Sequence, residues 1–318
     1  MNQPLNLKYS IVELAQSIQK TPQAIHKFCN ESGIDILSSK SRAFLEPQAM
    51  RQYLQKFGFT YSKGIICFQA CKGGVGKTSL CYHMGIRMAQ YGAKILLIDM
   101  DMQAHLTLAL LKNEHLDFLV WQDILSGKTI DEAIIKLHPH LHLIPSHLDN
   151  SYLDKTISQS HKILYTLYVA EHLKRVKQNY DLIIIDCAPA LSHINTAVSV
   201  ASDKILIPVT PDIFSFDGLE KTLSELKTLE SSFSKALEVM IILNRFDARE
   251  KNSLDVIANL KNKYGGLLCS TVVISSAEIK NSIASQEIIF DSRKNPPICR
   301  DIDALAKEVL DLKLPTYA

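Results

Sequence analysis

Three stretches of the sequence, ILLID, LIIID and VMIIL, are apolar at almost every position. A strand with one face in water alternates apolar and polar residues, so unbroken apolar runs are typical of strands that a sheet buries on both faces. From residue 63 onwards such runs alternate with amphipathic helical patterns. This alternation predicts an α/β fold, a doubly wound and mostly parallel sheet flanked by helices. The predicted strands are Ile65–Phe68, Lys94–Ile98, Leu141–Ile144, Leu182–Ile185, Lys204–Val209, Glu238–Leu243 and Leu268–Val273, and predicted helices include Thr78–Gln90, Asp217–Leu229 and Leu254–Lys263.

The composition indicates a soluble protein with a core, but it points to no particular binding partner. Of the 318 residues, 47% are hydrophobic and 21% charged, as in a soluble protein with a sizeable core, and the formal net charge is only +2. The seven cysteines are scattered without a CxxC pair, which argues against a disulfide framework and a zinc site. The sequence has no signal peptide and no apolar run of the roughly 20 residues that span a bilayer. We therefore expect a soluble, cytoplasmic protein that contacts no membrane.

The first sixty residues have a different residue pattern from the rest of the chain. Apolar residues recur at helical spacing before and after Thr21-Pro22, a pair that suits a helix start because a capping side chain precedes proline at the first helical position. A third helix is predicted from Glu46 to Lys56. Residues 1–63 contain eight Lys and Arg against four Asp and Glu, a balance of +4. We expect a small all-α module over residues 1–60, followed by the α/β domain over residues 61–318.

The stretch CKGGVGKTS follows the first predicted strand and leads into a helix that opens at Thr78. The glycines let the backbone curl so that its N–H groups converge on phosphate oxygens, and the helix N-terminus adds partial positive charge. Lys77 can reach the terminal phosphates, and the Thr78 hydroxyl can bind Mg²⁺. The stretch therefore predicts a phosphate-binding loop. It contains one more lysine than such a loop needs, Lys72.

Carboxylates stand at the ends of two other predicted strands. ILLIDMDMQ carries Asp99 and Asp101, and LIIID ends in Asp186. Doubly wound sheets place their ligands at the carboxyl ends of the strands, so these groups should meet the phosphate loop. A strand that ends in aspartate has the Walker B arrangement, in which the carboxylate supports Mg²⁺. The sequence therefore predicts an ATP and Mg²⁺ site.

Together KGGVGKT, LLIDMDMQ and DLIIIDCAP resemble the ParA/MinD group of deviant Walker A ATPases, and within it the ParA partition proteins, over roughly Gly64 to Leu312. The resemblance implies a Mg²⁺-dependent ATPase that forms a nucleotide-sandwich homodimer, in which Lys72 reaches the partner subunit's phosphates. By the same match the nucleotide is held by Lys72, Gly73, Gly74, Val75, Gly76, Lys77, Thr78, Ser79 and Asn244. Lys72, Lys77 and Asp101 are the implied catalytic residues, and Thr78, Asp99 and Asp186 are the implied metal residues. Met102, where the family usually has proline, and Cys71, where it commonly has glutamine, leave the hydrolysis rate open.

The resemblance also implies two places for contact with DNA. YSIVELAQSIQKTPQAIHKFCNESGI is similar to helix-turn-helix modules of the winged-helix or MerR kind, which some plasmid ParA proteins use to bind their own operator. The segment that begins SSAEIK lies where ParA proteins carry basic residues for sequence-independent binding. The expected contacts are Gln23, His26 and Lys27 in the first place and Lys280, Arg293 and Arg300 in the second. The alternatives are a three-helix interaction or dimerisation module and a surface run of charge.

These observations predict a partition ATPase that binds DNA as an ATP dimer, acts with a ParB-like centromere-binding protein, and associates with the nucleoid. Two other functions stay open. One is a ParA-like ATPase that positions a protein complex, and the other is a transcriptional repressor regulated by nucleotide. The run His138-Pro139-His140-Leu141-His142 also permits a metal site on one face of a strand, although no carboxylate or cysteine accompanies it.

Overall fold

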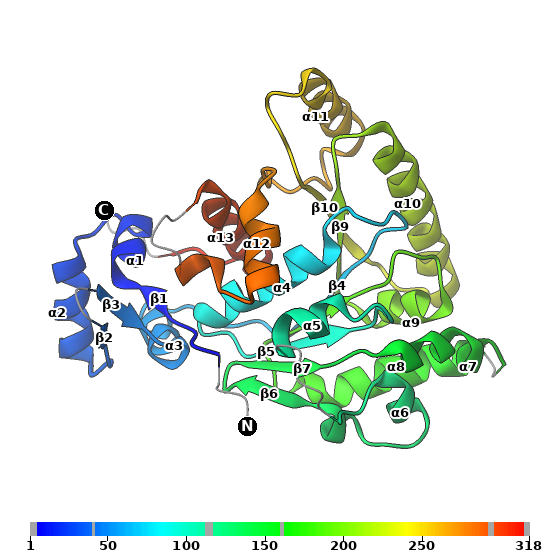
Figure 1. The fold of residues 1–318 in the computed structure, drawn as a ribbon, viewed down its shortest axis with the longest axis horizontal. Helices are drawn as coiled ribbons and strands as arrows, with labels where there is room; N and C mark the ends of the chain where they lie inside the picture. The colour runs from blue at the N-terminus through cyan, green and yellow to red at the C-terminus, as the bar shows by residue number, and fades with distance from the viewer. Residues whose placement is uncertain (1–4, 40–41, 112–116, 160–161, 292–295, 315–318) are drawn as a thin grey trace.

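The computed structural model describes residues 5–39, 42–111, 117–159, 162–291 and 296–314, and these residues form two sheets. The larger sheet has the order β10-β9-β4-β8-β5-β7-β6 and is parallel except for the edge strand β6 (Figure 1). Its strands are β4 (Gly64–Phe68), β5 (Ile95–Asp99), β6 (Ile135–His138), β7 (Leu141–Ile144), β8 (Leu182–Asp186), β9 (Lys204–Val209) and β10 (Glu238–Leu243). The predicted α/β fold is confirmed.

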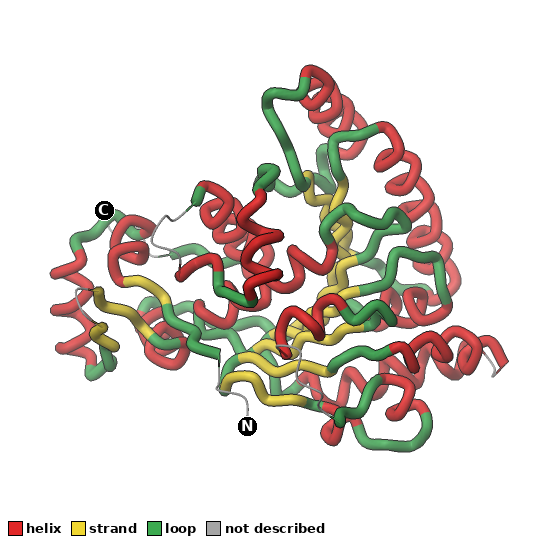
Figure 2. Tube along the Cα trace, in the orientation of Figure 1, coloured by secondary structure: helices red, strands yellow, loops and turns green. Residues whose placement is uncertain are grey.

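Helices cover both faces of this sheet (Figure 2). The α-helices are α4 (Lys77–Gln90), α5 (His105–Leu111), α6 (Trp121–Leu125), α7 (Leu153–Gln159), α8 (Lys162–Lys177), α9 (His193–Ala201), α10 (Ile213–Phe233), α11 (Lys251–Tyr264), α12 (Ala277–Ser285) and α13 (Pro297–Leu310). Short 3₁₀ helices occur at η1 (Ile130–Ala133), η2 (Leu148–Tyr152) and η3 (Ile289–Asp291). None of the helices in the described residues combines the length and apolar character that a membrane crossing requires.

Successive residues of each central strand enter two different hydrophobic cores. On β5, Leu96 and Ile98 belong to one core, whereas Ile95 and Leu97 belong to the core on the other face. Side chains of a strand point alternately to the two faces, so an unbroken apolar run fills both cores at once. This is why ILLID and LIIID are apolar throughout.

Two parts of the sheet differ from the sequence prediction. The antiparallel edge strand β6 was not predicted. The predicted strand Leu268–Val273 is wrong, because the segment makes only isolated bridges alongside β10. Its central amides, those of Ser270 and Thr271, are bound instead by the carboxylate of Glu308 on α13, at 2.7 and 3.1 Å. A side chain from a distant helix therefore replaces the strand ladder there.

The N-terminal residues form a module of helices and strands, so the prediction of an all-α module is wrong. The three predicted helices are present as α1 (Ile11–Ser17), α2 (Pro22–Ser32) and α3 (Pro47–Lys56), and Thr21 caps α2 as expected. The strands β1 (Tyr9–Ser10), β2 (Leu37–Ser39) and β3 (Arg42–Leu45) form an antiparallel sheet in the order β1-β3-β2. These strands have two to four residues, too few to show a period in the sequence.

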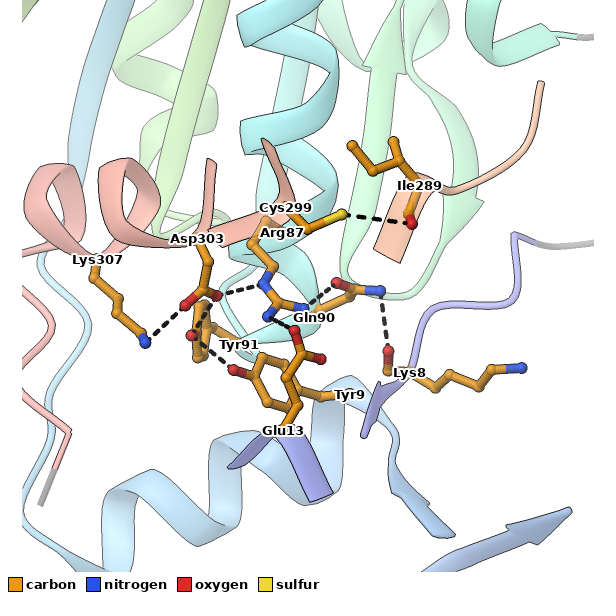
Figure 3. A network of polar contacts seen from close by, with 10 residues as sticks. All are labelled: Lys8, Tyr9, Glu13, Arg87, Gln90, Tyr91, Ile289, Cys299, Asp303 and Lys307. Carbon is orange, nitrogen blue, oxygen red and sulfur yellow. Dashed lines mark hydrogen bonds and ion pairs between the residues drawn. The ribbon is translucent and has the colours of Figure 1, made fainter. Parts of the chain in front are cut away.

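A buried cluster of polar side chains joins this module to the α/β fold (Figure 3). The guanidinium of Arg87, on α4, is fully shielded from solvent. It donates to Glu13 of α1 at 2.8 Å and to Asp303 of α13 at 2.6 Å. Asp303 also accepts from Tyr91 at 2.7 Å and pairs with Lys307 at 2.7 Å. Burial alone would raise the pKa of Asp303, but Arg87 and Lys307 hold it below its ordinary value.

A second contact fixes α3 of the module against the turn after α4. Arg51 donates to the carbonyl of Gly92 at 2.8 Å and pairs with Asp181 at 2.6 Å. Gly92 has a φ of +85°, and a Cβ at this position would lie 2.7 Å from the Cβ of Arg51 and from the Pro47 carbonyl. Only glycine allows α3 to approach this closely, so the turn is shaped to receive the module.

We expect Arg87→Met to destabilise the whole chain by about 3–5 kcal/mol, because it leaves buried carboxylates without their partner. Urea unfolding, followed by circular dichroism, measures the change. The matched control is Glu31→Gln, which breaks the exposed ion pair of Lys27 and Glu31 and should cost no more than about 1 kcal/mol. If Arg87→Met cost no more than this control, the network would not be what holds the module in place.

Candidate functional site

The predicted phosphate loop connects the carboxyl end of β4 to the first turn of α4. Gly74 and Gly76 have φ values of +77° and +95°, a conformation that favours glycine. Gly76 is the N-cap of α4, and Lys77 is its first residue. The loop therefore has the turn chemistry and the helix N-terminus that phosphate binding requires.

Asn244, at the end of β10, packs directly on this loop. Its side-chain Nδ2 donates to the carbonyl of Val75 at 2.8 Å. A Cβ on Gly76 would lie 2.3 Å from the same Nδ2 atom, so this glycine is also required for the close approach. The resemblance assigns Asn244 to adenine binding. In this structure its side chain stabilises the phosphate loop through the bond to Val75.

Lys77 points back into the loop instead of out to water. Only 6% of the residue is exposed, and its ammonium donates to the carbonyls of Ala70 and Lys72 at 3.3 and 3.4 Å. Burial lowers its pKa, and Asp186 opposes that effect. A buried ammonium held only by carbonyls is poised to take a stronger, anionic partner.

Asp186, at the end of β8, is the most unusual group in the site. The residue is 1% exposed, and both carboxylate oxygens are buried without a hydrogen bond of good geometry in the described part of the chain, although the Thr78 hydroxyl opposes the rise of its pKa. Burial, with the nearby charge of Asp99, raises its pKa well above the ordinary value. An unsatisfied buried carboxylate is costly unless it meets a proton or a cation, so its chemistry fits a Mg²⁺ ion or its bound water.

Asp99 has a different environment from Asp186, although both end parallel strands. One of its oxygens accepts from the backbone N–H of Asp101 at 3.1 Å. The other accepts from the backbone and hydroxyl of Thr107 at 2.9 and 2.8 Å. Burial raises its pKa to about 7 in spite of these bonds. Asp99 therefore shapes the segment that carries Asp101, and its oxygens are taken by protein donors.

Lys72 lies within its own subunit, against the first turn of α10. Its ammonium donates to Asp212 at 2.5 Å and to Ser215 at 3.1 Å. Burial would raise the pKa of Asp212, but the bonds from Lys72, Thr210 and Ser215 lower it to about 2. Sequence reasoning missed Asp212. This residue follows the carboxyl end of β9, in the same way that Asp99 ends β5 and Asp186 ends β8. That position was the signal that could have found it.

A cavity of about 320 Å³ opens beside the loop and can hold part of a ligand. It is bounded by Gly76 and Ser79 of the loop, by Asn244, and by the segment that leads into α12. Sequence reasoning missed three of its lining residues, Arg245, Ser275 and Ser276. They were missed because Ser275 and Ser276 were assigned to a segment expected to contact DNA, and nothing in the local sequence shows that this segment meets Arg245 after β10.

The residues predicted to contact DNA lie in separate places. Gln23 and Lys27 are exposed on α2 and His26 is half-buried, so the three share one helix but not the same exposure. Lys280 is exposed on α12 and lines the cavity beside the loop. Arg300 is exposed on α13, and Arg293 lies outside the described residues.

The metal hypothesis for the histidine run is wrong for the described residues, which contain no group of three or more His, Cys, Asp or Glu arranged to hold a metal ion. The histidines are used in hydrogen bonds instead. His138 accepts from the backbone N–H of His140, and His142 bonds the Tyr180 hydroxyl at 2.7 Å.

Comparison with known proteins gives one family match and several relatives. The family described as AAA domain matches residues 63–239, more than half of the chain. An uncharacterised protein of Methanocaldococcus jannaschii is 30% identical over 249 residues, 76% of this chain and 95% of the relative. The cell division protein PomZ of Myxococcus xanthus is 29% identical over 243 residues, 75% of each chain. The chromosome-partitioning ATPase Soj of Treponema pallidum is 27% identical over 244 residues, 75% of this chain and 94% of Soj.

Solved structures share the fold. A variant of McdA from Cyanothece in complex with ATP matches with a TM-score of 0.72 at 23% identity, covering 81% of this chain and 100% of McdA. Cobyrinic acid a,c-diamide synthase from Mycobacterium smegmatis, with bound ADP and magnesium, matches with a TM-score of 0.63 at 19% identity, covering 80% and 99% of the two chains. At these identities the likeness establishes the fold alone.

His83 on α4 contacts the first turn of this helix, and its protonation should make the stability of the protein depend on pH. Its Nδ1 lies 2.7 Å from the Ser79 carbonyl and its Nε2 lies 2.9 Å from the Ser282 hydroxyl, so the neutral ring satisfies both contacts. Burial lowers its pKa from 6.5 to about 4. Between these values the unfolded chain binds a proton that the folded chain does not, so stability falls as the pH drops, by up to about 3 kcal/mol. Measured by urea unfolding, the stability advantage of the wild type over His83→Gln should shrink over this range. A stability advantage that stays constant with pH would contradict a neutral His83 in the folded protein.

Proposed function

Because the chain belongs to the ParA/MinD type of ATPases, we propose that it is a DNA partition ATPase whose two copies enclose ATP and Mg²⁺ between them. In this proposal the ATP dimer binds DNA without sequence preference and stays on the nucleoid. A ParB-like protein bound to a centromere site stimulates hydrolysis, which releases the dimer from DNA. The named relatives include a chromosome-partitioning ATPase, which favours DNA as the cargo.

The observation that carries the ATPase part is the unsatisfied carboxylate of Asp186. It lies at the strand end beside a glycine loop whose buried lysine also lacks an anionic partner in the described residues. A phosphate chain with Mg²⁺ satisfies both groups at once, because the phosphates meet Lys77 and the metal meets the carboxylate. The Thr78 hydroxyl at the first turn of α4 would complete the protein's share of the metal site.

Each type of group then has a separate task in the proposed mechanism. The amides of residues 73–77 and the Lys77 ammonium bind and orient the phosphates. Asp101 is held in place through the Asp99 carboxylate and orients the attacking water. Mg²⁺, when bound, neutralises charge on the phosphate oxygens. These roles rest on the resemblance and on the placement of the residues around one loop.

Lys72 would supply the cation that stabilises charge growing on the transferred phosphoryl group. In this structure it is bound to Asp212 of its own subunit. Reaching a partner's phosphates requires it to leave that carboxylate, so Asp212 competes with the partner's nucleotide for Lys72. Dimerisation and ATP binding then become one linked equilibrium.

Lys72→Ala should abolish ATP-dependent dimerisation, because the shared cation is lost, while leaving the monomer folded. Light scattering with and without ATP and Mg²⁺ measures the mass. The matched control is Lys221→Ala, which removes a lysine from the exposed side of α10 and should dimerise like the wild type. A Lys72→Ala protein that dimerises normally with ATP would sink the shared-site hypothesis.

We further propose that residues 1–60 form a winged helix-turn-helix module that binds DNA, with the operator of the protein's own operon as its target. The support is the pair α1 and α2, the short sheet behind them, and the exposed Gln23 and Lys27 on α2. Arg42 at the start of β3 is exposed on the strand pair that would serve as the wing. An interaction or dimerisation module is the alternative use of the same elements.

The double variant Gln23→Ala/Lys27→Ala should lose preference for the protein's own upstream DNA while keeping ATP-dependent binding to random DNA. Fluorescence anisotropy at two salt concentrations measures both affinities, because binding through phosphates weakens steeply with salt. Point variants are preferable to deleting residues 1–60, since deletion would uncover Arg87 and Tyr91. The control is Glu31→Gln on the same helix. Unchanged upstream preference in the double variant would favour the interaction module instead.

Two alternative functions would use the same ATP site but act on a different target. The similarity to the cell division protein PomZ favours an ATPase that positions a protein complex. The N-terminal module favours a repressor that uses nucleotide as a ligand. ATP-dependent binding to random DNA separates the repressor from the other two, and the identity of the bound cargo separates positioning from partition.

A further inference from the structure

A second cavity, of about 350 Å³, lies at the opposite edge of the sheet from the phosphate loop. It is bounded by the turns that precede β5, β7 and β8, so it opens at the amino ends of these parallel strands. The phosphate loop follows the carboxyl end of β4. A five-residue strand separates the two edges by roughly 16 Å, so the cavity is not part of the proposed ATP site.

Two lysines give the cavity a positive character. Lys94 precedes β5, and Lys136 lies on β6. Both residues are exposed, and within the described part of the chain no acidic side chain forms an ion pair with either of them. Asp131 is the only carboxylate among the residues that line the cavity, so the lining carries more positive than negative charge.

The histidine run supplies the neutral donors of the same cavity. His142 bonds the Tyr180 hydroxyl through Nδ1 at 2.7 Å. Burial raises the pKa of Tyr180 to about 12, so the hydroxyl stays protonated and can donate to Nδ1. When the hydroxyl donates in this bond, the ring proton of neutral His142 is on Nε2 and can be donated to a ligand. Burial lowers the pKa of His142, and Lys136, His140 and Lys94 add to the effect.

His140 forms a fixed wall between the cavity and the N-terminal module. It is 4% exposed, and its two ring nitrogens lie 3.1 Å from the Gly92 carbonyl and 3.2 Å from Oε1 of Gln48 on α3. If Nδ1–H donates to the Gly92 carbonyl, the neutral ring has no second N–H, so His140 holds the turn in shape and is not a free donor. The cavity is therefore built on packed elements.

We propose that this cavity binds a phosphate group, held by the ammonium groups of Lys94 and Lys136 and by the Nε2–H of His142. Lysines bind phosphate as point charges with several rotatable donors, and a tetrahedral oxyanion can accept from donors that approach from different directions. A cation is excluded as the occupant because two ammonium groups repel it. The phosphate comes either from a free phosphorylated compound or from the backbone of DNA. The inference does not depend on the proposed ATPase cycle.

The test uses the full-length protein labelled with ¹⁵N-histidine and observed by NMR, with inorganic phosphate as the probe. Two rings in one spectrum report on the two edges of the sheet. His142 reports on the cavity, and His83, which contacts the Ser79 carbonyl, reports on the phosphate loop. His142→Asn identifies the His142 signal. The expected result is that phosphate shifts the His142 signal and that sodium chloride at equal ionic strength does not.

The variant Lys94→Ala/Lys136→Ala should weaken this response by about tenfold for each lysine removed. Its matched control is Lys128→Ala/Lys313→Ala, which removes two exposed lysines elsewhere and should respond like the wild type. A duplex oligonucleotide that shifts His142 identifies the DNA backbone as the source, and a response to free phosphate alone identifies a small compound. The proposal is overturned by a shift confined to His83, by an equal shift with sodium chloride, or by a response that survives in Lys94→Ala/Lys136→Ala. A shift confined to His83 would place the phosphate at the loop of the proposed ATP site, and the other outcomes do not bear on that site.

Discussion

The buried guanidinium of Arg87 constrains the whole chain because its charge can be accommodated only when three elements are in place together. A charge without solvent is costly unless carboxylates and hydrogen bonds surround it. Glu13 comes from α1, Asp303 comes from α13, and the arginine itself comes from α4 (Figure 3). The N-terminal module therefore cannot detach without exposing the Arg87 guanidinium and removing Glu13, one of its two carboxylate partners.

The same helix carries the phosphate loop at its other end. Lys77 is the first residue of α4, and Arg87 lies in its last turns. A helix of this length spans about 21 Å. Phosphate contacts at the first turn and the module contacts at the last turn thus share one rigid element. Asn244 and His83 brace the first half, and Gly92 receives α3 at the far end.

The parts of the fold that were predictable from sequence are those whose signal is local. Unbroken apolar runs identify β5, β8 and β10, and Thr21-Pro22 identifies the start of α2. The strands β1, β2, β3 and β6 have only two to four residues, too few to show a period. β1 pairs with the distant β3, whereas β2 with β3 and β6 with β7 form hairpins. Leu268–Val273 fails for a related reason, because Glu308 of α13 binds amides that a strand would have offered to β10. The loop residues and Asp186 were predictable by their order along the chain. Asp212 could have been found from its position after β9, whereas the lining of the cavity beside the loop depends on contacts between segments far apart in sequence.

The polarity of the parallel sheet explains why the chain separates its charged groups. The carboxyl ends of the strands gather Asp99, Asp101 and Asp186 around the phosphate loop, whereas the amino ends face the module and the second cavity. Asp181 links the two features of the amino edge, because one of its oxygens accepts from the backbone N–H of Lys94 while the carboxylate pairs with Arg51. In a dimer closed across the phosphate loops, the modules would therefore stand at the outer ends, away from the shared nucleotides. A chain arranged in this way keeps its nucleotide chemistry inside the dimer and leaves both its module and the second cavity open to solvent.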